Sequence, residues 1–247
     1  FLRLCGAGLT GVVKRSDLKA YDLSTLSRVT TAAAYSMADE LNLPRPKNVT
    51  TIKPSGTLSK IMDTTEGLHK PLGRYIFNNV NFGKHDPLVG ALRTAGYRTF
   101  ANPNDPEGVL ITLPVEYSDV EFTRTDDGTF INDESAIDQL NRYRLYQRFW
   151  TQQNTSVTIS YDISEIGAII SWLLDNWDDY VGVSFLFRND PTKTAEDLGH
   201  QYLPQEVVTK EVYDAYVDSL EPFDIDEYNS FDEIEDEGCA TGACPIR

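Results

Sequence analysis

The chain has 247 residues, a length that allows one large domain or two smaller ones with a substantial hydrophobic core. Hydrophobic residues make up 40% of it and charged residues 24%, a composition that is typical of globular proteins and excludes a disordered or fibrous one. The formal net charge of −16 argues against binding to nucleic acid or to an anionic membrane, because both need a basic surface.

No apolar run approaches the roughly 18 residues of a membrane-spanning helix, and the start of the chain shows no signal-peptide pattern. Three cysteines are too few for a secreted disulfide framework, so we expect a cytoplasmic protein. The sequence begins at Phe1 inside FLRLCGAGLTGVV, a stretch typical of the interior of a domain. We therefore interpret the chain as a fragment, a processed product or one half of a split protein.

Helical and strand patterns alternate along the sequence. Ser24 is the expected N-cap of a helix reaching about residue 42, with an apolar stripe that consists of Leu26, Val29, Ala33, Met37 and Leu41. A strand is expected at 49–53, directly before a loop and a helix start. Further strands are expected at 74–82, 108–115, 157–161 and 181–187. Further helices are expected at 87–95, at 134–152, after a cap at Asp162 or Ser164, and after a cap at Thr209.

This alternation predicts an α/β fold with a largely parallel sheet or barrel over residues 1–220. Residues 221–247 are expected to form a flexible tail. Nine acidic residues and no Lys or Arg fall between Glu221 and Glu237, and such a block repels itself and stays extended.

The first stretch that could carry chemistry is TTIKPSGTLSK, residues 50–60. It places small and hydroxyl residues where a strand passes into a helix, and free backbone N–H groups at such a place can bind phosphate. The stretch lacks the GxxxxGK[ST] pattern of a Walker A loop. An ordinary strand-to-helix turn has a similar composition, so both interpretations stay open.

Just downstream, His69, Lys70 and Arg74 could form a cationic cluster beside this loop, although surface solvation explains each of them singly. The three histidines have no ligand spacing with each other or with the cysteines, so no metal site is expected. The sequence also contains no GxSxG, HExxH or Rossmann fingerprint.

The sharper signal is the pair Cys239 and Cys244 in GCATGACPIR, at the end of the acidic segment. The C-x4-C spacing in a Gly/Ala-rich tail lets the two sulfurs meet, and exposure makes thiol–disulfide exchange fast. A zinc site would need two more ligands nearby, so redox shuttling is the better interpretation. Cys5 is expected to be a small buried hydrophobic residue without a role in chemistry.

Five stretches occur in a specific order: TIKPSGTLSKIMDTTEGLHKPLGRY, DPLVGALRTAGY, NTSVTISYD, NWDDYVGVSFL and CATGACPIR. Together they resemble the C-terminal part of a ribonucleotide reductase catalytic chain, closest to the monomeric, adenosylcobalamin-dependent (class II) type. The resemblance covers residues 6–247.

The resemblance implies the later strands and helices of a ten-stranded α/β barrel, with adenosylcobalamin as cofactor and ribonucleoside di- or triphosphates as substrates, triphosphates being favoured. It assigns substrate phosphate binding to six residues of one loop: Pro54, Ser55, Gly56, Thr57, Leu58 and Ser59. It also implies that Cys239 and Cys244 carry electrons from a thioredoxin-like donor to an active-site disulfide.

The family's radical cysteine, in an Asn-Pro-Cys-Gly-Glu context, is missing from this sequence, as are the two cysteines of the active-site disulfide. A partner carrying the N-terminal half is therefore expected, and the chain alone should not turn over. Two alternatives remain. One is a fragment of a class I large subunit, against which the lack of an adjacent Tyr-Tyr pair in the late strands speaks. The other is a non-catalytic module that binds phosphate and thioredoxin.

Overall fold

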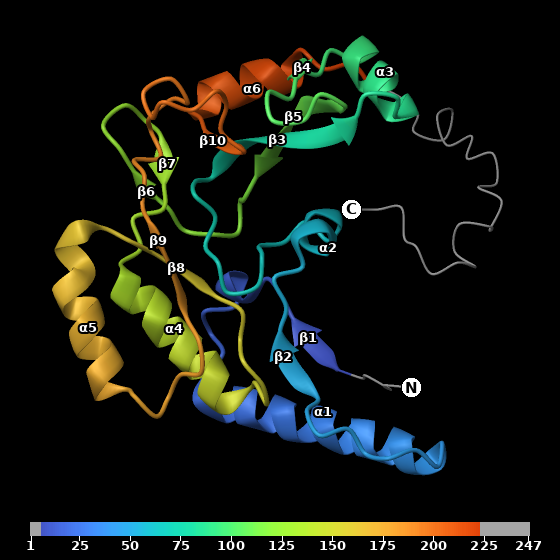
Figure 1. The fold of residues 1–247 in the computed structure, drawn as a ribbon, viewed down its shortest axis with the longest axis vertical. Coiled ribbons are helices and arrows are strands. Elements are labelled where there is room, and N and C mark those ends of the chain that lie inside the picture. The colour runs from blue at the N-terminus through green and yellow to red at the C-terminus, as the bar shows by residue number, and fades with distance from the viewer. Residues whose placement is uncertain (1–5, 223–247) are drawn as a thin grey trace. The chain divides into compact units, whose positions relative to one another are not determined.

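The computed structural model describes residues 6–222, so Cys5, Cys239 and Cys244 lie outside the described residues. The chain divides into two compact units. Unit 1 comprises Phe1–Tyr75 and Glu116–Lys193, and unit 2 comprises Ile76–Val115 and Thr194–Arg247. Figure 1 labels the elements of both. The proposed tail at 221–247 lies almost entirely beyond the described part of the chain.

Unit 1 contains two strand–helix–strand units with parallel strands. Strand β1 (Ala7–Leu9) leads through α1 (Ala20–Glu40) to β2 (Thr50–Ile52), which pairs with β1 in parallel. Strand β8 (Thr158–Tyr161) leads through α5 (Ile166–Asp175) to β9 (Ser184–Phe187), again in parallel. Two parallel strands need a long crossover connection, and a helix supplies it in both cases. The smaller elements of this unit are η1 (Val12–Lys14), α2 (Gly56–Ile61), β6 (Thr123–Arg124), β7 (Phe130–Ile131) and η2 (Ile163–Glu165).

Helix α4 (Ala136–Phe149) is the centre of the core of unit 1. It begins where the Ser135 side chain accepts a hydrogen bond from the backbone N–H of Asp138, as an N-cap should. Leu140, Tyr143 and Tyr146 are buried along one face, and α4 contacts both α1 and α5. The predicted helix at 134–152 is therefore confirmed, with the apolar spacing giving the correct inward face.

Helix α1 differs from its prediction at its start and on its apolar face. It begins four residues before Ser24, where the Asp22 carboxylate accepts a hydrogen bond from the Lys19 backbone N–H at 3.0 Å. The buried residues are Leu23 and Ala38. The predicted stripe instead lies on the exposed side of the helix, with Leu26 44% and Leu41 59% exposed. The predicted stripe is therefore apolar, but the residues of α1 that are buried in unit 1 lie outside it.

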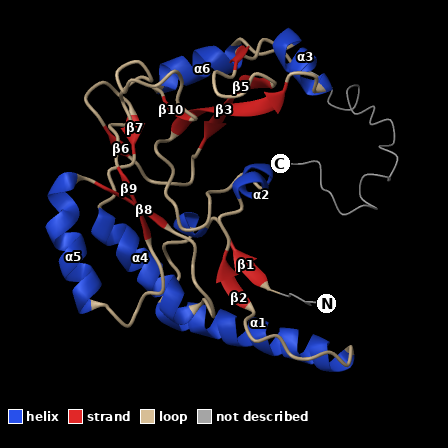
Figure 2. Ribbon diagram, viewed as in Figure 1, coloured by secondary structure: helices blue, strands red, loops and turns tan. Residues whose placement is uncertain are grey.

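Unit 2 is a four-stranded sheet covered by two helices (Figure 2). The strand order is β10 (Gln205–Val207), β3 (Tyr75–Gly83), β5 (Gly108–Glu116), β4 (Thr99–Ala101). The helices are α3 (Pro87–Thr94), capped by Asp86, and α6 (Lys210–Asp218), capped by Thr209 as predicted. The pairs β10–β3 and β4–β5 are antiparallel. The expectation of a largely parallel sheet therefore holds for β1–β2 and β8–β9 of unit 1. It does not hold for the sheet of unit 2, where the loop that joins β4 to β5 is too short for a crossover connection.

Within residues 6–222, no helix is long and apolar enough to span a membrane. The expected strand at 181–187 is shorter than its apolar run, because β9 begins only at Ser184. All four residues of β9 are exposed, so the run does not form the buried strand that a continuous apolar sequence suggests.

Candidate functional site

The candidate site lies where the chain leaves the carboxyl ends of β1 and β2. These strands are parallel and in register from Ala7 opposite Thr50 to Leu9 opposite Ile52, so the segments that follow them emerge at the same edge. The carboxyl edge of parallel strands is the usual place of ligand binding in α/β proteins. Here the two segments are Thr10-Gly11 and the predicted phosphate loop that starts at Pro54.

The loop turns sharply into α2. Ser55 adopts a left-handed conformation with φ of 54°, which is uncommon for a residue other than glycine. Gly56 begins the helix, and a Cβ built on it would meet no heavy atom within 4 Å. The space beside Gly56 is therefore open. Two of the other predicted residues differ in exposure, because Leu58 is exposed whereas Ser59 is fully buried.

Ser59 stabilises the first turn of α2. Its backbone N–H donates to the Ser55 carbonyl at 2.6 Å, and its hydroxyl donates to the Gly56 carbonyl at 3.2 Å. Because this hydroxyl is buried and already bonded, Ser59 holds the shape of the loop from within. The backbone N–H groups at the start of α2 are the groups of this segment that a phosphate can reach.

The Thr10 hydroxyl ties three segments together behind the loop. It accepts a hydrogen bond from the Gly67 backbone N–H at 2.9 Å and lies 3.2 Å from the Thr65 carbonyl oxygen and 3.5 Å from that of Pro54. The Gly11 N–H also donates to the Thr65 carbonyl at 2.9 Å. The loop after β1 therefore fixes both the phosphate loop and the segment at 65–67.

Two glycines make this close packing possible. Gly67 has φ of +50°, and a Cβ on it would lie 3.2 Å from the Cα of Pro54. Gly11 has φ of +68°, and its Cβ would lie 2.2 Å from Oγ1 of Thr64. Both positions combine a left-handed backbone with a neighbour that leaves no room for a side chain.

One polar atom near this junction lacks a hydrogen bond. The Thr65 side chain is fully buried, and its Oγ1 has no partner in the described part of the chain. A buried hydroxyl without a partner costs about 1–3 kcal/mol, so such a group calls for an explanation. Its carbonyl, by contrast, accepts hydrogen bonds from the loop after β1.

The predicted cationic cluster of His69, Lys70 and Arg74 does not present three free charges. The Nε2 of His69 accepts a hydrogen bond from the Thr158 backbone N–H at 3.1 Å, so Nδ1, 3.3 Å from the Glu66 carbonyl, carries the proton. Burial lowers the pKa of His69, which keeps the imidazole neutral. His69 therefore links the segment at 65–69 to β8.

The other two cations of this group pair with neighbours. Arg74 forms an ion pair with Glu116 at 2.9 Å and lies over the ring of Phe130 at 5.9 Å. The Lys70 ammonium lies over the ring of Phe122 at 5.4 Å. Lys53 is different, because it directly precedes the loop, is exposed, and has no ion-pair partner among the described residues. Lys53 belongs to the KPSGT motif but is not one of the six residues to which the resemblance assigns phosphate binding.

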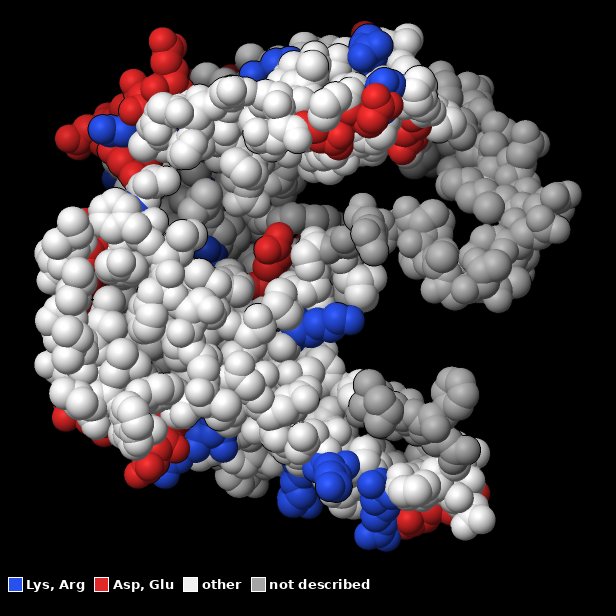
Figure 3. All heavy atoms as spheres, viewed as in Figure 1, with Lys and Arg blue, Asp and Glu red and all other residues white. Residues whose placement is uncertain are grey.

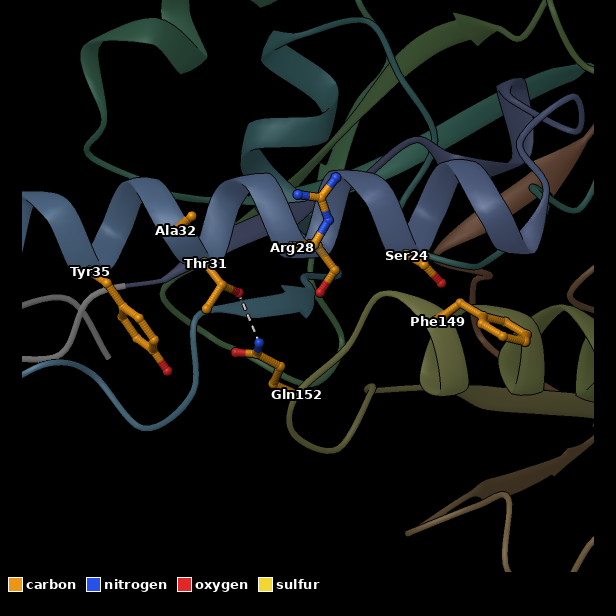
Figure 4. A pocket seen from close by; sticks show the side chains of 8 residues that line it. Ser24, Arg28, Thr31, Ala32, Tyr35, Phe149 and Gln152 are labelled. Atoms are coloured by element: carbon orange, nitrogen blue, oxygen red, sulfur yellow. Dashed lines mark hydrogen bonds between the residues drawn. The ribbon is translucent and has the colours of Figure 1, made fainter.

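A hollow of about 450 Å³ lies beside α1 (Figure 4). Ser24, Arg28, Thr31 and Tyr35 line it from one face of α1, and Phe149 and Gln152 close it from the end of α4. Gln152 is fully engaged, since its amide donates to Thr31 Oγ1 at 2.9 Å and its Oε1 accepts from the Val49 N–H at 2.7 Å. Among residues 6–222, no group of three or more His, Cys, Asp or Glu side chains could hold a metal ion.

No protein family model matches the chain. It is 26% identical over 212 residues to a probable adenosylcobalamin-dependent ribonucleoside-triphosphate reductase of Dictyostelium discoideum, which covers 83% of this chain and 26% of that protein. The adenosylcobalamin-dependent ribonucleoside-triphosphate reductase of Levilactobacillus brevis is 25% identical over 232 residues, covering 91% of this chain and 30% of that protein. The enzyme of the same name from Lactobacillus leichmannii is 27% identical, over 80% of this chain and 26% of that protein.

A crystal structure of a B12-dependent (class II) ribonucleotide reductase superposes with a TM-score of 0.69 at 23% identity, over 85% of this chain and 28% of that one. The similarity confirms that the fold is that of a part of such a reductase. The chain spans between 26% and 30% of the length of these curated relatives.

Proposed function

Because the homologues of this chain are adenosylcobalamin-dependent ribonucleoside-triphosphate reductases, we propose that it forms the C-terminal part of a reductase of that kind, in the cytoplasm. The observation that carries this proposal is similarity over 80–91% of the chain, together with the shared fold. The substrate is a ribonucleoside triphosphate, which the enzyme reduces to the deoxyribonucleotide.

In this function the loop formed by Pro54, Ser55, Gly56, Thr57, Leu58 and Ser59 binds the substrate phosphates. Three observations support this role: the loop lies at the carboxyl edge of β1–β2, Gly56 leaves open space, and Lys53 adds a positive charge that has no ion-pair partner within residues 6–222. Backbone N–H groups at a helix start and a nearby ammonium are both suited to a phosphate. Adenosylcobalamin supplies the radical that starts the reaction, and the residues of this loop bind and orient the substrate.

The remaining part of the enzyme, which carries the radical cysteine, completes the barrel in our proposal. Support comes from the two parallel sheets of unit 1, β1–β2 and β8–β9, which contain two strands each among the described residues. Parallel sheets occur almost entirely with both faces covered, whereas Phe185, Leu186 and Phe187 of β9 are exposed. Further strands and helices from the remaining part would cover these residues and extend the two pairs toward a ten-stranded barrel.

The acidic segment at 221–247 acts as an arm in this proposal, and Cys239 and Cys244 collect electrons from a thioredoxin-like protein. They pass the electrons to a disulfide that forms in the remaining part of the enzyme at each turnover. Support comes from the sequence, which places two cysteines after a run of nine acids without a basic residue.

The test of the function is deoxyribonucleotide formation with adenosylcobalamin and a small dithiol. We expect no product from the chain alone. Product should form once a polypeptide carrying the Asn-Pro-Cys-Gly-Glu region is present, as a separate chain or joined to this one. Turnover by the chain alone, or activity that does not depend on adenosylcobalamin, would contradict the proposal.

The phosphate loop is tested by Gly56→Val in the assembled enzyme. The side chain would fill the open space, and losing two or three charge-assisted hydrogen bonds at about 1.5–3 kcal/mol each would raise KM at least about 100-fold. Gly90→Val is the matched control, because Gly90 in α3 also has no heavy atom near a built Cβ. An unchanged KM in the Gly56 variant would show that the phosphates bind elsewhere.

A further inference from the structure

The loop proposed to bind phosphate contains no charged residue between Pro54 and Ser59. In Figure 3 the described surface over α2 and over the ends of β1 and β2 is mostly uncharged, with charged groups at its border. Apart from the neighbouring Lys53, the loop must therefore bind a phosphate through its backbone N–H groups. Such hydrogen bonds weaken steeply as the N–H direction turns away from the acceptor, so the affinity depends on the alignment of the loop.

The alignment of the loop depends on Gly67, which lies directly against it. A Cβ built on Gly67 would lie 3.2 Å from the Cα of Pro54 and 3.4 Å from the Lys53 carbonyl oxygen, so the two segments are in close contact. The residue after Pro54, Ser55, has a left-handed backbone with φ of 54°. A residue other than glycine keeps this conformation only where its surroundings fix it. A shift of Gly67 would therefore move Pro54 and the start of α2 as well.

Gly67 is in turn held by Thr10. The Gly67 N–H donates to Oγ1 of Thr10 at 2.9 Å, and the Gly67 carbonyl accepts a hydrogen bond from the Val12 N–H at 3.2 Å. Gly67 is buried, and the Thr10 hydroxyl is the partner of its N–H within residues 6–222. Without this hydroxyl a buried N–H would lose its hydrogen bond, which is unfavourable enough to displace the segment.

The Thr10 hydroxyl also reaches the loop itself. Its Oγ1 lies 3.2 Å from the Thr65 carbonyl oxygen and 3.5 Å from the Pro54 carbonyl oxygen, and either of these can accept its proton. Threonine is branched at Cβ, which restricts its χ1 rotation and keeps the hydroxyl in one place. One side chain thus contacts both the loop and the segment that supports it.

Backbone hydrogen bonds fix the position of Thr10 on both sides. The Leu9 carbonyl accepts a hydrogen bond from the Lys53 N–H at 2.9 Å, and the Gly11 N–H donates to the Thr65 carbonyl at 2.9 Å. Thr10 therefore has a fixed place between β1 and the loop, although it is none of the six residues assigned to the phosphates.

We propose that Thr10 is a positioning residue for the phosphate loop. Its hydroxyl acts through Gly67 and Pro54 and aligns the backbone N–H groups at the start of α2 with the substrate phosphates. Thr10 itself does not touch the substrate. The inference rests on the proposed function of the loop and adds to it a residue that controls the affinity from behind.

The first test is Thr10→Val in the assembled enzyme, which removes the hydroxyl and keeps the shape of the side chain. We expect KM for the ribonucleoside triphosphate to rise about three- to tenfold, the effect of losing about one hydrogen bond, with kcat little changed. Thr10→Ser keeps the hydroxyl and should restore most of the wild-type KM.

The second test asks whether the effect is specific to phosphate. The probe is inorganic tripolyphosphate, used as a competitive inhibitor and compared with the nucleoside of the substrate, which has no phosphate. In Thr10→Val the inhibition constant of tripolyphosphate should rise by the same factor as KM, whereas that of the nucleoside should stay at the wild-type value. A general loosening of the fold would weaken both inhibitors alike.

Thr50→Val is the matched control, because it makes the same substitution at a buried threonine of β2. The Thr50 hydroxyl contacts Ser27 and the Trp150 carbonyl and not the loop. This variant should lower the stability of the protein, as Thr10→Val does, and leave KM unchanged.

The proposal is overturned by a wild-type KM in Thr10→Val, by an equal rise of KM in Thr50→Val, by equal weakening of the nucleoside, or by a serine variant no better than valine. Thr10→Ala replaces the valine variant in each comparison if the latter does not fold. The Gly56→Val result separates this inference from the proposed function. If Gly56→Val raises KM and Thr10→Val does not, the loop binds the phosphates without help from Thr10. If neither changes KM, the assignment of the loop fails as well.

Discussion

At the scale of single residues, the candidate site depends on backbone positions that tolerate only glycine. Gly67 has a left-handed backbone and lies against the backbone of Pro54, whereas Gly56 has open space around it. The two glycines therefore differ in their physical role although they lie in the same region. Gly67 fixes the loop, and Gly56 leaves room at its surface.

We expect Gly67→Ala to lower the free energy of unfolding by about 1–3 kcal/mol, because the left-handed conformation and the close Pro54 Cα both oppose a methyl group. Gly56→Ala should change it by no more than about 0.5–1 kcal/mol. Urea unfolding of both variants measures the difference. Equal effects would mean that the packing of Gly67 on Pro54 does not limit stability.

His69 gives a prediction for the pH dependence of stability. Burial lowers its pKa in the folded protein below the ordinary value of 6.5, so the unfolded chain binds the proton more readily. The stability that neutral His69 contributes is complete above about pH 7 and is lost progressively as the pH falls through 6.5 toward the lowered value. Protonation also removes the acceptor for the Thr158 N–H.

The measurement is the free energy of unfolding of wild type and His69→Gln between about pH 7.5 and 5.5. Glutamine can still accept the Thr158 N–H but does not titrate, so the wild-type curve should fall relative to that of the variant. Parallel curves would contradict a buried neutral imidazole. The difference between the free energies of unfolding of the two proteins removes the pH dependence that comes from the carboxylates, because both proteins share them.

At the scale of elements, β2 is held to the end of α4 by hydrogen bonds on its buried face. Thr50 Oγ1 donates to the Trp150 carbonyl at 2.5 Å, and Ser27 Oγ of α1 donates to the same carbonyl at 2.9 Å. The Trp150 indole N–H in turn donates a hydrogen bond to the Thr51 carbonyl at 2.7 Å. One carbonyl thus joins three elements of unit 1.

Thr50→Val should lower the free energy of unfolding by about 1 kcal/mol, because Ser27 still satisfies the carbonyl. Adding Ser27→Ala should leave that carbonyl unpaired and cost about 1–3 kcal/mol more, so the two changes should not be additive. Thr51→Val is the control, since in the described part of the chain its hydroxyl hydrogen-bonds only to the neighbouring Ile52 carbonyl, at 3.3 Å. Additive losses would show that the two hydroxyls act independently.

The sequence predicted most elements of the fold, because their signals are local. The Thr209 cap located the start of α6, and the helix predicted at 87–95 matches α3, with Gly96, whose φ is +90°, directly after the C-cap Ala95. The buried face of α1 could not be predicted in this way, because the apolar stripe is not the face that is buried. Periodicity shows which face of a helix is apolar, whereas the element that covers the face depends on the tertiary structure.

The candidate site was predictable only in part. The KPSGT pattern located the loop, and the open space at Gly56 agrees with that prediction. The role of Thr10 could not be predicted, since its contacts with Pro54, Thr65 and Gly67 join segments more than 40 residues apart. The neutral state of His69 could not be predicted either, because it depends on the burial of the imidazole and on its hydrogen bond from the Thr158 N–H.

At the scale of the whole molecule, our proposal separates electron delivery from radical chemistry. Replacing both Cys239 and Cys244 by Ser in the assembled enzyme should abolish repeated turnover with thioredoxin. The first turnover of pre-reduced enzyme should remain, because the active-site dithiol already holds the electrons for it. A small dithiol that enters the site should restore part of the steady-state rate.

The measurement compares a single-turnover burst with the steady-state rate for the double variant. Loss of the burst together with the steady state would contradict the shuttle, and so would full turnover with thioredoxin. A purely structural disulfide would lower the stability of the protein and make the choice of electron donor irrelevant.

The division of unit 1 into two stretches of sequence has a consequence for synthesis on the ribosome. Residues 76–115, which belong to unit 2, separate the two stretches, and Thr50 reaches its partner Trp150 only 100 residues later. At about 5–20 residues per second, β2 and α1 wait roughly 5–20 s in the nascent chain before α4 exists to cover them. Over that interval the newly made α1 exposes Leu23, which the finished core of unit 1 buries, as well as its outward stripe.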